Sequence, residues 1–202
     1  MGSMEEDVYR TIENISEGLY KEKGSKFLAF AYPVVSEEQV KIILDELRTR
    51  YYDARHHCYA YRLGAGNPRI RANDDGEPSS TAGKPILGQI VSAELTDILV
   101  VVVRYFGGIK LGVSGLINAY RTAAADALAH AKPVEKTVRE ELRFHFGYAV
   151  LNDVMKVIKE EDPEVLQRDF GCSCSLTVSV RKKLAPVLKT RLSRIESLIW
   201  EE

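Results

Sequence analysis

The sequence predicts an α+β protein with two domains, and three observations indicate this fold class. Apolar residues alternate with polar ones in several short segments and recur at helical spacing in others, so strands and helices are interspersed. Hydrophobic residues make up 45% of the chain and charged residues 28%, which suits a packed core. The pattern restarts after Pro133. We therefore expect one domain over residues 1–133 and a second over residues 134–202.

Local patterns define each element of the first domain. A turn at Lys23-Gly24-Ser25 splits the early strand material into a hairpin. Ser36 and Gln39 form a capping box at the start of an amphipathic helix. A valine-rich run is typical of a buried central strand. In order, we expect strands over 8–14 and 19–34, a helix over 36–50, strands over 56–63 and 69–73, a loop over 74–83, a short helix over 87–95, a strand over 98–106 and a helix to about Ala131.

The second domain shows a different and more compact pattern. Apolar residues alternate from Leu142 to Tyr148, as in a half-buried strand, and a helix stops before Pro163. The remaining strands are expected over 165–171, 174–180 and 195–200, with a helix over 184–192. The order β-α-β-β-α-β is that of the ferredoxin-like split motif.

Bulk properties narrow the function classes. A net charge of -1 provides no general attraction to nucleic acid or to an anionic membrane, so any such binding needs local segregation of charge. The three cysteines are an odd number without disulfide-scaffold density and suit a reducing compartment. No apolar run approaches the length that spans a bilayer. We expect a cytoplasmic protein with no membrane association.

Ordered strings of glycine, proline and charged residues distinguish the first domain. They are Asp74-Asp75-Gly76-Glu77-Pro78, Thr81-Ala82-Gly83-Lys84-Pro85 and Arg104-Tyr105-Phe106-Gly107-Gly108-Ile109-Lys110-Leu111-Gly112. With Lys23-Gly24-Ser25-Lys26-Phe27, His57, Gly115-Leu116 and Ala119-Tyr120, these strings resemble the Impact family, in its bacterial YigZ-like branch, over most of residues 20–130.

The resemblance implies both fold and partners. The first domain is expected to be similar to the second domain of ribosomal protein S5, and the second to the C-terminal modules of elongation factor G. Both similarities point toward RNA and the ribosome. Eukaryotic members of the family are translation regulators that bind the activator of a stress kinase, but they carry an extra N-terminal domain that is not expected in this chain, so that partner is not transferred to it.

Three positions depart from the family pattern. Ser80 stands where a glycine follows Pro-Ser, Ser114-Gly115 replaces a glycine pair, and Asn118 replaces an arginine. Glycine tolerates positive φ better than serine, so the first two changes are expected to alter backbone freedom. The third removes a positive charge.

The glycine-rich loop is a candidate phosphate site. It leads into a helix that Ser114 is placed to cap, and backbone N–H groups at such a helix start bind anions. No carboxylate lies between Asp97 and Asp126, so the cations of this stretch lack local counter-charges. The alternative is that the glycines only turn the chain. The candidate residues here are Lys84, Arg104, Gly107, Gly108, Lys110, Gly112, Ser114 and Arg121.

A second candidate is catalytic or metal-binding. Asp74, Asp75 and Glu77 place three carboxylates in four residues, and His57 could act with them as a base or ligand. A structural turn explains the same residues. The spacing is not that of an EF-hand, and Cys172 with Cys174 lacks zinc-ligand spacing. We therefore expect no metal and no cofactor.

The second domain carries a run of basic residues without an acidic one. Such an edge suits phosphate contacts, although a solvated helix face balanced by Glu160-Glu161-Asp162 is the alternative. The basic residues are Arg181, Lys182, Lys183, Lys189, Arg191 and Arg194.

The main hypothesis for the whole chain is a non-enzymatic, translation-linked protein that binds RNA, the ribosome or a protein factor. The alternative is an enzyme acting on a phosphorylated or nucleotide substrate. The sequence leaves self-association open.

Overall fold

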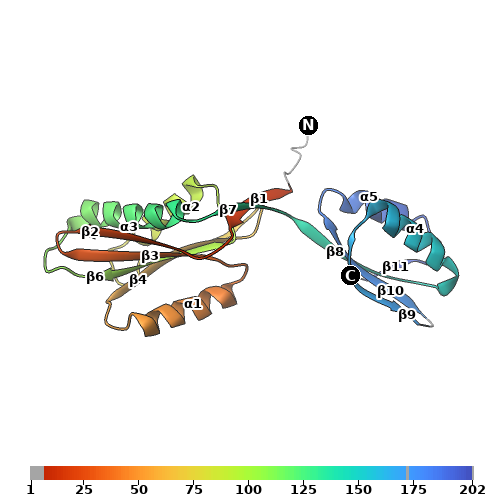
Figure 1. Ribbon diagram of the computed structural model, residues 1–202, viewed down its shortest axis with the longest axis horizontal. Helices are drawn as coiled ribbons and strands as arrows, with labels where there is room; N and C mark the ends of the chain where they lie inside the picture. The colour runs from red at the N-terminus through yellow and green to blue at the C-terminus, as the bar shows by residue number, and fades with distance from the viewer. Residues whose placement is uncertain (1–6, 172, 202) are drawn as a thin grey trace. The chain divides into compact units, whose positions relative to one another are not determined.

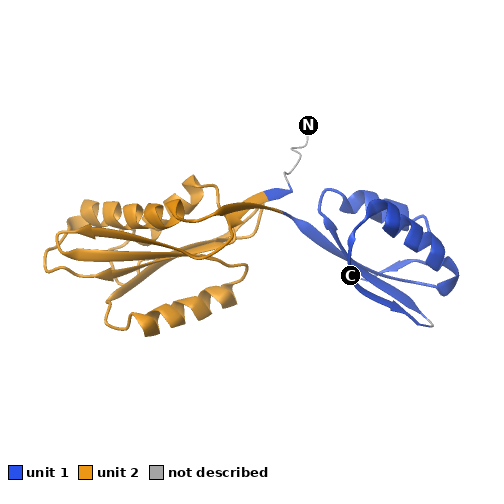
Figure 2. Ribbon diagram, in the orientation of Figure 1, with its two compact units in different colours: residues 1–8, 137–202 blue, residues 9–136 orange. Residues whose placement is uncertain are grey.

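A computed structural model describes residues 7–171 and 173–201. The chain has a mixed α+β fold and forms two compact units (Figure 2). The first unit spans Tyr9–Lys136. The second unit comprises Thr137–Glu202 with the N-terminal stretch that ends at Val8. The structure thus assigns Asp7 to the second unit rather than to the first, because its carboxylate bonds to Arg181 and its carbonyl oxygen accepts from the N–H of Val138.

The first unit is a five-stranded antiparallel sheet with helices on both faces (Figure 1). Helix α1 covers one face, and helices α2 and α3 cover the other. The strand order is β2-β3-β6-β4-β5, which makes β6 the central strand. The elements are β2 (Ser16–Glu22), β3 (Ser25–Pro33), α1 (Glu37–Arg50), β4 (His56–Leu63), β5 (Arg69–Asn73), α2 (Gly83–Ser92), β6 (Ile98–Tyr105) and α3 (Gly112–Ala129).

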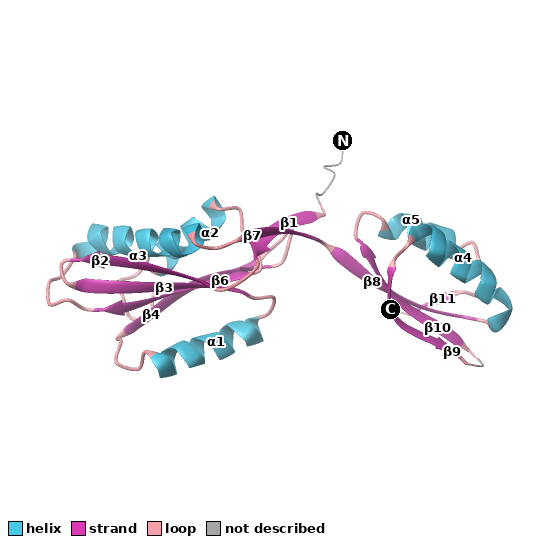
Figure 3. Cartoon of the chain, in the orientation of Figure 1, coloured by secondary structure: helices cyan, strands magenta, loops and turns pink. Residues whose placement is uncertain are grey.

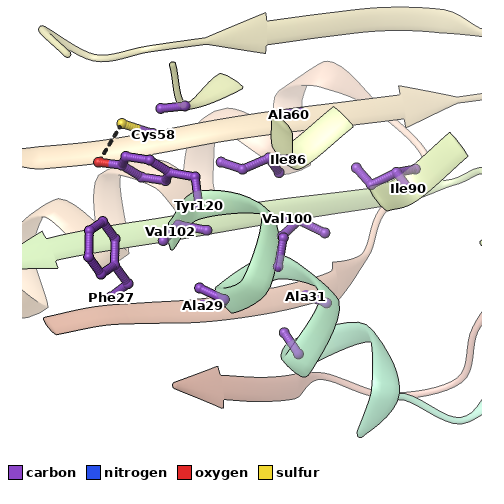
Figure 4. Close-up of a cluster of buried hydrophobic side chains, with 14 of the residues drawn as sticks. Phe27, Ala29, Ala31, Cys58, Ala60, Ile86, Ile90, Val100, Val102 and Tyr120 are labelled. Carbon is purple, nitrogen blue, oxygen red and sulfur yellow. Dashed lines mark hydrogen bonds between the residues drawn. The ribbon is translucent and has the colours of Figure 1, made fainter. Parts of the chain in front are cut away.

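Strand β6 is apolar from residue 98 to residue 103 because both of its faces are covered there. Val100 and Val102 pack into the cluster beneath α2 and α3, and Val101 and Val103 pack into the cluster beneath α1. Figure 4 shows the first cluster, in which Tyr120 of α3 projects between the sheet and the helices. The prediction of a buried central strand is confirmed.

The second unit is a four-stranded antiparallel sheet with helices α4 and α5 on one face (Figure 3). Its strand order β11-β8-β10-β9 and its element sequence confirm the predicted β-α-β-β-α-β pattern. A separate two-stranded sheet joins β1 (Val8–Ile12) and β7 (Pro133–Thr137). The elements of the unit are β8 (Arg139–Phe146), a 3-10 turn (Tyr148–Val150), α4 (Leu151–Glu161), β9 (Glu164–Phe170), β10 (Cys174–Arg181), α5 (Ala185–Leu192) and β11 (Ile199–Trp200).

Two helices begin earlier than the sequence predicts. Helix α2 spans Gly83–Ser92 rather than the predicted 87–95, and its buried face includes Ile86 and Ile90. Helix α3 begins at Gly112, which places Ser114 inside the first turn rather than at a cap.

In the described part of the chain, none of the helices is long and apolar enough to cross a membrane.

Asp74 caps the start of α2 from eight to nine residues upstream. Its Oδ1 accepts from the N–H groups of Ala82 (3.0 Å) and Gly83 (2.8 Å), and its Oδ2 accepts from the N–H of Ser80 (2.8 Å). Burial by itself would raise the pKa of the Asp74 carboxyl, but the three backbone N–H groups and Lys84 bring it below its ordinary value. Satisfying these N–H groups allows α2 to begin at Gly83.

The departures from the family pattern have different structural effects. Ser80 has φ +66°, in the left-handed region where glycine is favoured, so the expected effect on backbone freedom applies there. Ser114 lies exposed in regular helix, where glycine brings no advantage. Asn118 is exposed on α3, with its Nδ2 3.5 Å from the hydroxyl of Tyr20.

The turn between β2 and β3 packs directly against the glycine-rich loop. A Cβ on Gly107 would lie 1.9 Å from the carbonyl carbon of Gly24 and 2.1 Å from the nitrogen of Ser25. The N–H of Gly107 donates to Oγ of Ser25 at 3.2 Å. Glycine at 107 is therefore required by backbone-to-backbone contact, and two separate sequence motifs meet at this point.

Replacing Gly107 by alanine tests this contact. The added methyl forces the two backbones apart, so we expect Gly107→Ala to lower the free energy of unfolding by about 1–3 kcal/mol in urea denaturation. Gly88→Ala is the matched control, because Gly88 lies in α2 with open space around its Cβ position. The control is expected to raise stability by about 0.4–1 kcal/mol. Equal stability of Gly107→Ala and wild type would contradict the close approach.

The Asp74 cap predicts a pH-dependent contribution to stability. Asp74→Asn replaces one acceptor oxygen by a donor, so we expect a loss of about 0.5–2 kcal/mol at pH 7. Because the folded pKa of Asp74 is lowered, its contribution is complete above its ordinary pKa of about 4 and is lost as pH falls through the folded value. The difference between wild type and Asp74→Asn in urea denaturation should narrow on acidification.

The control for Asp74 is an exposed carboxylate on α1. Asp45→Asn should change the free energy of unfolding by less than about 0.5 kcal/mol at either pH. A deficit of Asp74→Asn that stays constant, or grows, as pH falls would rule out the capping role of the ionised carboxylate.

Candidate functional site

A hollow of about 480 Å³ lies in the first unit where strands β4 and β6 meet the start of α3. We call it the Arg104 hollow. It brings together the acidic loop after β5 and the glycine-rich loop after β6, which are far apart in the sequence. Its lining residues are Arg55, His56, Glu77, Pro78, Arg104, Phe106, Lys110, Leu111, Gly112, Val113 and Leu116.

A buried ion pair forms one wall of the hollow. Nη1 of Arg104 donates to Oε1 of Glu77 at 2.6 Å, and the Tyr120 hydroxyl donates to the same oxygen at 2.7 Å. The side chains of Glu77 and Arg104 are only 4% and 8% exposed. Arg104 therefore has a counter-charge. The prediction that the cations of the glycine-rich stretch lack counter-charges is wrong for this residue. The partner comes from a segment 27 residues earlier.

The Arg104 guanidinium also contacts two aromatic rings. Its central carbon lies 5.5 Å from the ring centroid of Phe27 and 5.7 Å from that of Phe106. These distances are within the range of cation–π interactions. Nε of Arg104 is buried and has no hydrogen-bond partner among the described residues. The Arg104 side chain thus has an ionic partner and two aromatic contacts, and its Nε–H is the donor that none of them uses.

Two further cations line the hollow. In the described part of the chain, neither Arg55 nor Lys110 lies within 4.0 Å of a carboxylate, and both residues are exposed. With Arg104, the lining holds three cations and the single carboxylate of Glu77. Gly112 and Val113 come from the first turn of α3, where no side chain caps the backbone N–H groups. The local charge therefore favours an anion.

The predicted catalytic residues do not converge. Oδ2 of Asp75 accepts from the backbone N–H of His57 at 2.6 Å, and Asp75 also lies 3.8 Å from Arg48 of α1. Asp74 caps α2, while Glu77 faces Arg104 in the hollow. Of the four residues proposed for acid–base or metal chemistry, only His57 and Asp75 thus lie near each other, while Asp74 and Glu77 have separate partners. No group of three metal-ligating side chains occurs in residues 7–171 and 173–201.

His56 rather than His57 lines the hollow. Successive residues of β4 point to opposite faces, so His57 shares the α1 face with Tyr59, where burial lowers its pKa. Nδ1 of His56 lies 2.8 Å from the carbonyl oxygen of Asp75. His57 therefore meets the acidic loop only at Asp75. Its backbone N–H donates to Oδ2 of Asp75, and its Nδ1 lies 3.9 Å from the same oxygen.

The two described cysteines, Cys58 and Cys174, are buried, which does not suit nucleophilic chemistry. Burial raises the pKa of the Cys58 thiol far above its ordinary value, and its Sγ bonds to the carbonyl oxygen of Asp74 and to the Tyr120 hydroxyl. Burial likewise raises the pKa of Tyr120, which stays protonated as a donor to Glu77. Cys174 is buried in the second core, and Cys172 lies outside the described residues.

The other predicted phosphate-binding residues divide between the hollow and its surroundings. Arg104, Lys110 and Gly112 line it, whereas the remaining five are not among its lining residues: Lys84, Gly107, Gly108, Ser114 and Arg121. Sequence reasoning missed Arg55, His56 and Phe106. Phe106 carried a signal, because it is an aromatic residue next to two glycines at the end of a buried strand.

The basic run of the second unit is largely neutralised. Arg181 and Lys183 lie 3.1 and 3.8 Å from Asp7, and Lys189 lies 2.6 Å from Glu140. Arg191 pairs with both Glu160 and Glu161. The prediction of an unbalanced basic edge is therefore wrong for these four residues. Glu160 and Glu161 balance Arg191, in agreement with the alternative of a balanced helix face, and Asp7 and Glu140 pair with the other three. Lys182 and Arg194 are exposed on the same unit.

Comparison with known proteins agrees with the motifs in the first unit. The family model described as the Impact N-terminal domain matches residues 23–128. An IMPACT family member from Thermus thermophilus is 49% identical over 180 residues, which cover 88% of this chain and 97% of the relative. The IMPACT family member YigZ of Escherichia coli is 33% identical over 160 residues, which cover 78% of each protein.

A solved structure shares the fold along nearly the whole chain. That crystal structure, of a protein described as hypothetical, is 28% identical, covers 96% of both chains and has a TM-score of 0.75. The match therefore extends over both the motif-rich first unit and the ferredoxin-like second unit. By its family model and its relatives, the chain belongs to the Impact family, in the bacterial branch of YigZ-like proteins.

Proposed function

We propose that this protein is a non-enzymatic, translation-linked regulator that binds RNA, free or in the ribosome, through phosphate groups at the Arg104 hollow. The observation that carries the proposal is the cation excess of the hollow. Arg55 and Lys110 lie beside the uncapped start of α3, while the only lining carboxylate is engaged by Arg104 and Tyr120. Phosphates are the most common partners of such arrangements.

Translation enters the proposal through the family. The motif strings that place the chain in the Impact family are the ones that build the hollow, since Glu77, Arg104, Lys110 and Gly112 all belong to them. Eukaryotic members of that family are translation regulators, as the resemblance implies. A site built from the motifs that resemble this family, some of whose members regulate translation, supports a partner from the translation apparatus.

The enzyme alternative has less support. It requires the glycine-rich loop to hold a phosphate and His57, Asp74, Asp75 or Glu77 to act as base or metal ligand. The three carboxylates instead contact a backbone N–H, cap a helix and form a buried ion pair, and His57 lies on the α1 face, away from the hollow. A general base must reach the proton that it abstracts. Each carboxylate already has its hydrogen-bond partners, and binding is the simpler use of the hollow.

Charge reversal at Lys110 tests the proposal. For Lys110→Glu, we expect the affinity for a structured RNA to fall roughly tenfold or more at about 50 mM salt, because a phosphate contact is lost and a repulsion is added. The slope of log affinity against log salt should also decrease by about one. Filter binding over a salt series measures both quantities.

The matched control is Lys41→Glu. Lys41 is exposed on α1, which covers the opposite face of the sheet, so its reversal changes the net charge equally without touching the hollow. It should leave RNA affinity nearly unchanged. Undetectable RNA binding at low salt, or equal losses in the two variants, would refute the proposal.

A further inference from the structure

We infer that the Arg104 hollow binds a single unpaired nucleotide of RNA, with its base stacked on Phe106 and its phosphate among Arg55, Arg104 and Lys110. This inference rests on the proposed function and narrows it from RNA in general to unpaired segments. The feature that carries it is an exposed aromatic ring adjoining an anion-favouring site.

Phe106 is placed as a stacking platform. It follows the last residue of β6, is 52% exposed, and lines the hollow together with the cations. The Arg104 guanidinium lies 5.7 Å from its ring centroid, and the ion pair with Glu77 holds that guanidinium in place. The ring thus lies against a side chain that is held by a buried ion pair, and about half of Phe106 stays exposed to a ligand. Unstacked bases in RNA are recognised by such aromatic side chains.

Arg104 supplies an independent sign of a ligand. The residue is 6% exposed, lines the hollow, and keeps an Nε–H donor without a partner among the described residues. Buried donors in folded proteins are nearly always satisfied, and an unsatisfied one calls for an explanation. Because Nε itself is covered, a phosphate oxygen would accept from this donor in a charge-assisted hydrogen bond once the lining side chains move apart.

The size and lining of the hollow favour one nucleotide over a duplex backbone. Its volume of about 480 Å³ falls in the range of small-ligand pockets. Apolar side chains of Leu111, Val113 and Leu116 adjoin the cations, which suits a base and sugar next to a phosphate. In a duplex the base faces are stacked on each other, so only phosphates reach the site. Only an unpaired nucleotide uses both halves of the lining.

The test compares one RNA strand in its single-stranded and paired forms. Fluorescence anisotropy with a labelled strand of roughly ten nucleotides, alone or annealed to its complement, measures both affinities on the full chain. We expect tighter binding of the single strand. Phe106→Leu should weaken single-strand binding by about five- to a hundredfold while leaving duplex binding unchanged, because leucine is apolar but offers no ring to stack on.

Two controls separate stacking from general damage. Phe106→Tyr keeps the ring and should retain wild-type affinity for the single strand. In competition, a nucleoside 5′-monophosphate should displace the single strand at much lower concentration than inorganic phosphate does, because it supplies base and phosphate together. Equal competition by inorganic phosphate would show that the base contributes nothing, and would overturn the inference.

The outcomes distinguish this inference from the proposed function. If single strand and duplex bind equally, Phe106→Leu alters neither, and Lys110→Glu weakens both, then RNA binding stands and the unpaired-nucleotide inference is overturned. If wild-type protein binds neither form at low salt, the proposed function is refuted and this inference with it. Selective loss of single-strand binding in Phe106→Leu, with recovery in Phe106→Tyr, supports both.

Discussion

The buried ion pair between Glu77 and Arg104 is the interaction on which the candidate site depends. It joins the loop after β5 to the central strand, and Tyr120 ties α3 to the same carboxylate oxygen. Removing two charges from water is costly, and such a pair persists only when its hydrogen bonds are well formed. Loss of either partner would leave an uncompensated buried charge, at a cost of about 3–5 kcal/mol. The pair also fixes the guanidinium beside Phe106.

Close packing of two backbones sets the position of the glycine-rich loop. Gly107 lies against Gly24 at a distance that excludes any side chain, so the loop leaves β6 along a fixed path. Gly112 then adopts φ +73°, in the left-handed region, as the chain turns into α3. Between these two points lies Lys110, whose charge faces the hollow. Sterics at Gly107 and the backbone conformation of Gly112 thus constrain the loop, and both Lys110 and Phe106 line the hollow.

Counter-charges from distant segments decide which basic residues remain available for an anion. Arg104 is neutralised by Glu77, and Arg181 and Lys183 share the carboxylate of Asp7. Counting charges along a stretch of sequence overestimated the basic character of the second unit. The hollow keeps its cation excess because Arg55, which precedes β4, and Lys110 of the glycine-rich loop have no carboxylate within 4.0 Å among the described residues. Charge in three dimensions differs from charge in sequence whenever ion pairs are long-range.

Most of the fold could be predicted from the sequence, because periodicity, capping residues and glycines are local signals. The central strand, the helix capped by Ser36 and the ferredoxin-like order were all recognised from such signals. The start of α2 was not, since its cap is the distant Asp74. By itself, the sequence determined the family, the elements and the motifs that build the site. Only the tertiary structure decided that His56 and not His57 faces the hollow, and that Glu77 pairs with Arg104. It alone also decided that Phe106 lines the same hollow as the unpaired cations of Arg55 and Lys110. These relations depend on strand register and on contacts between residues far apart in the chain, which local sequence patterns do not contain.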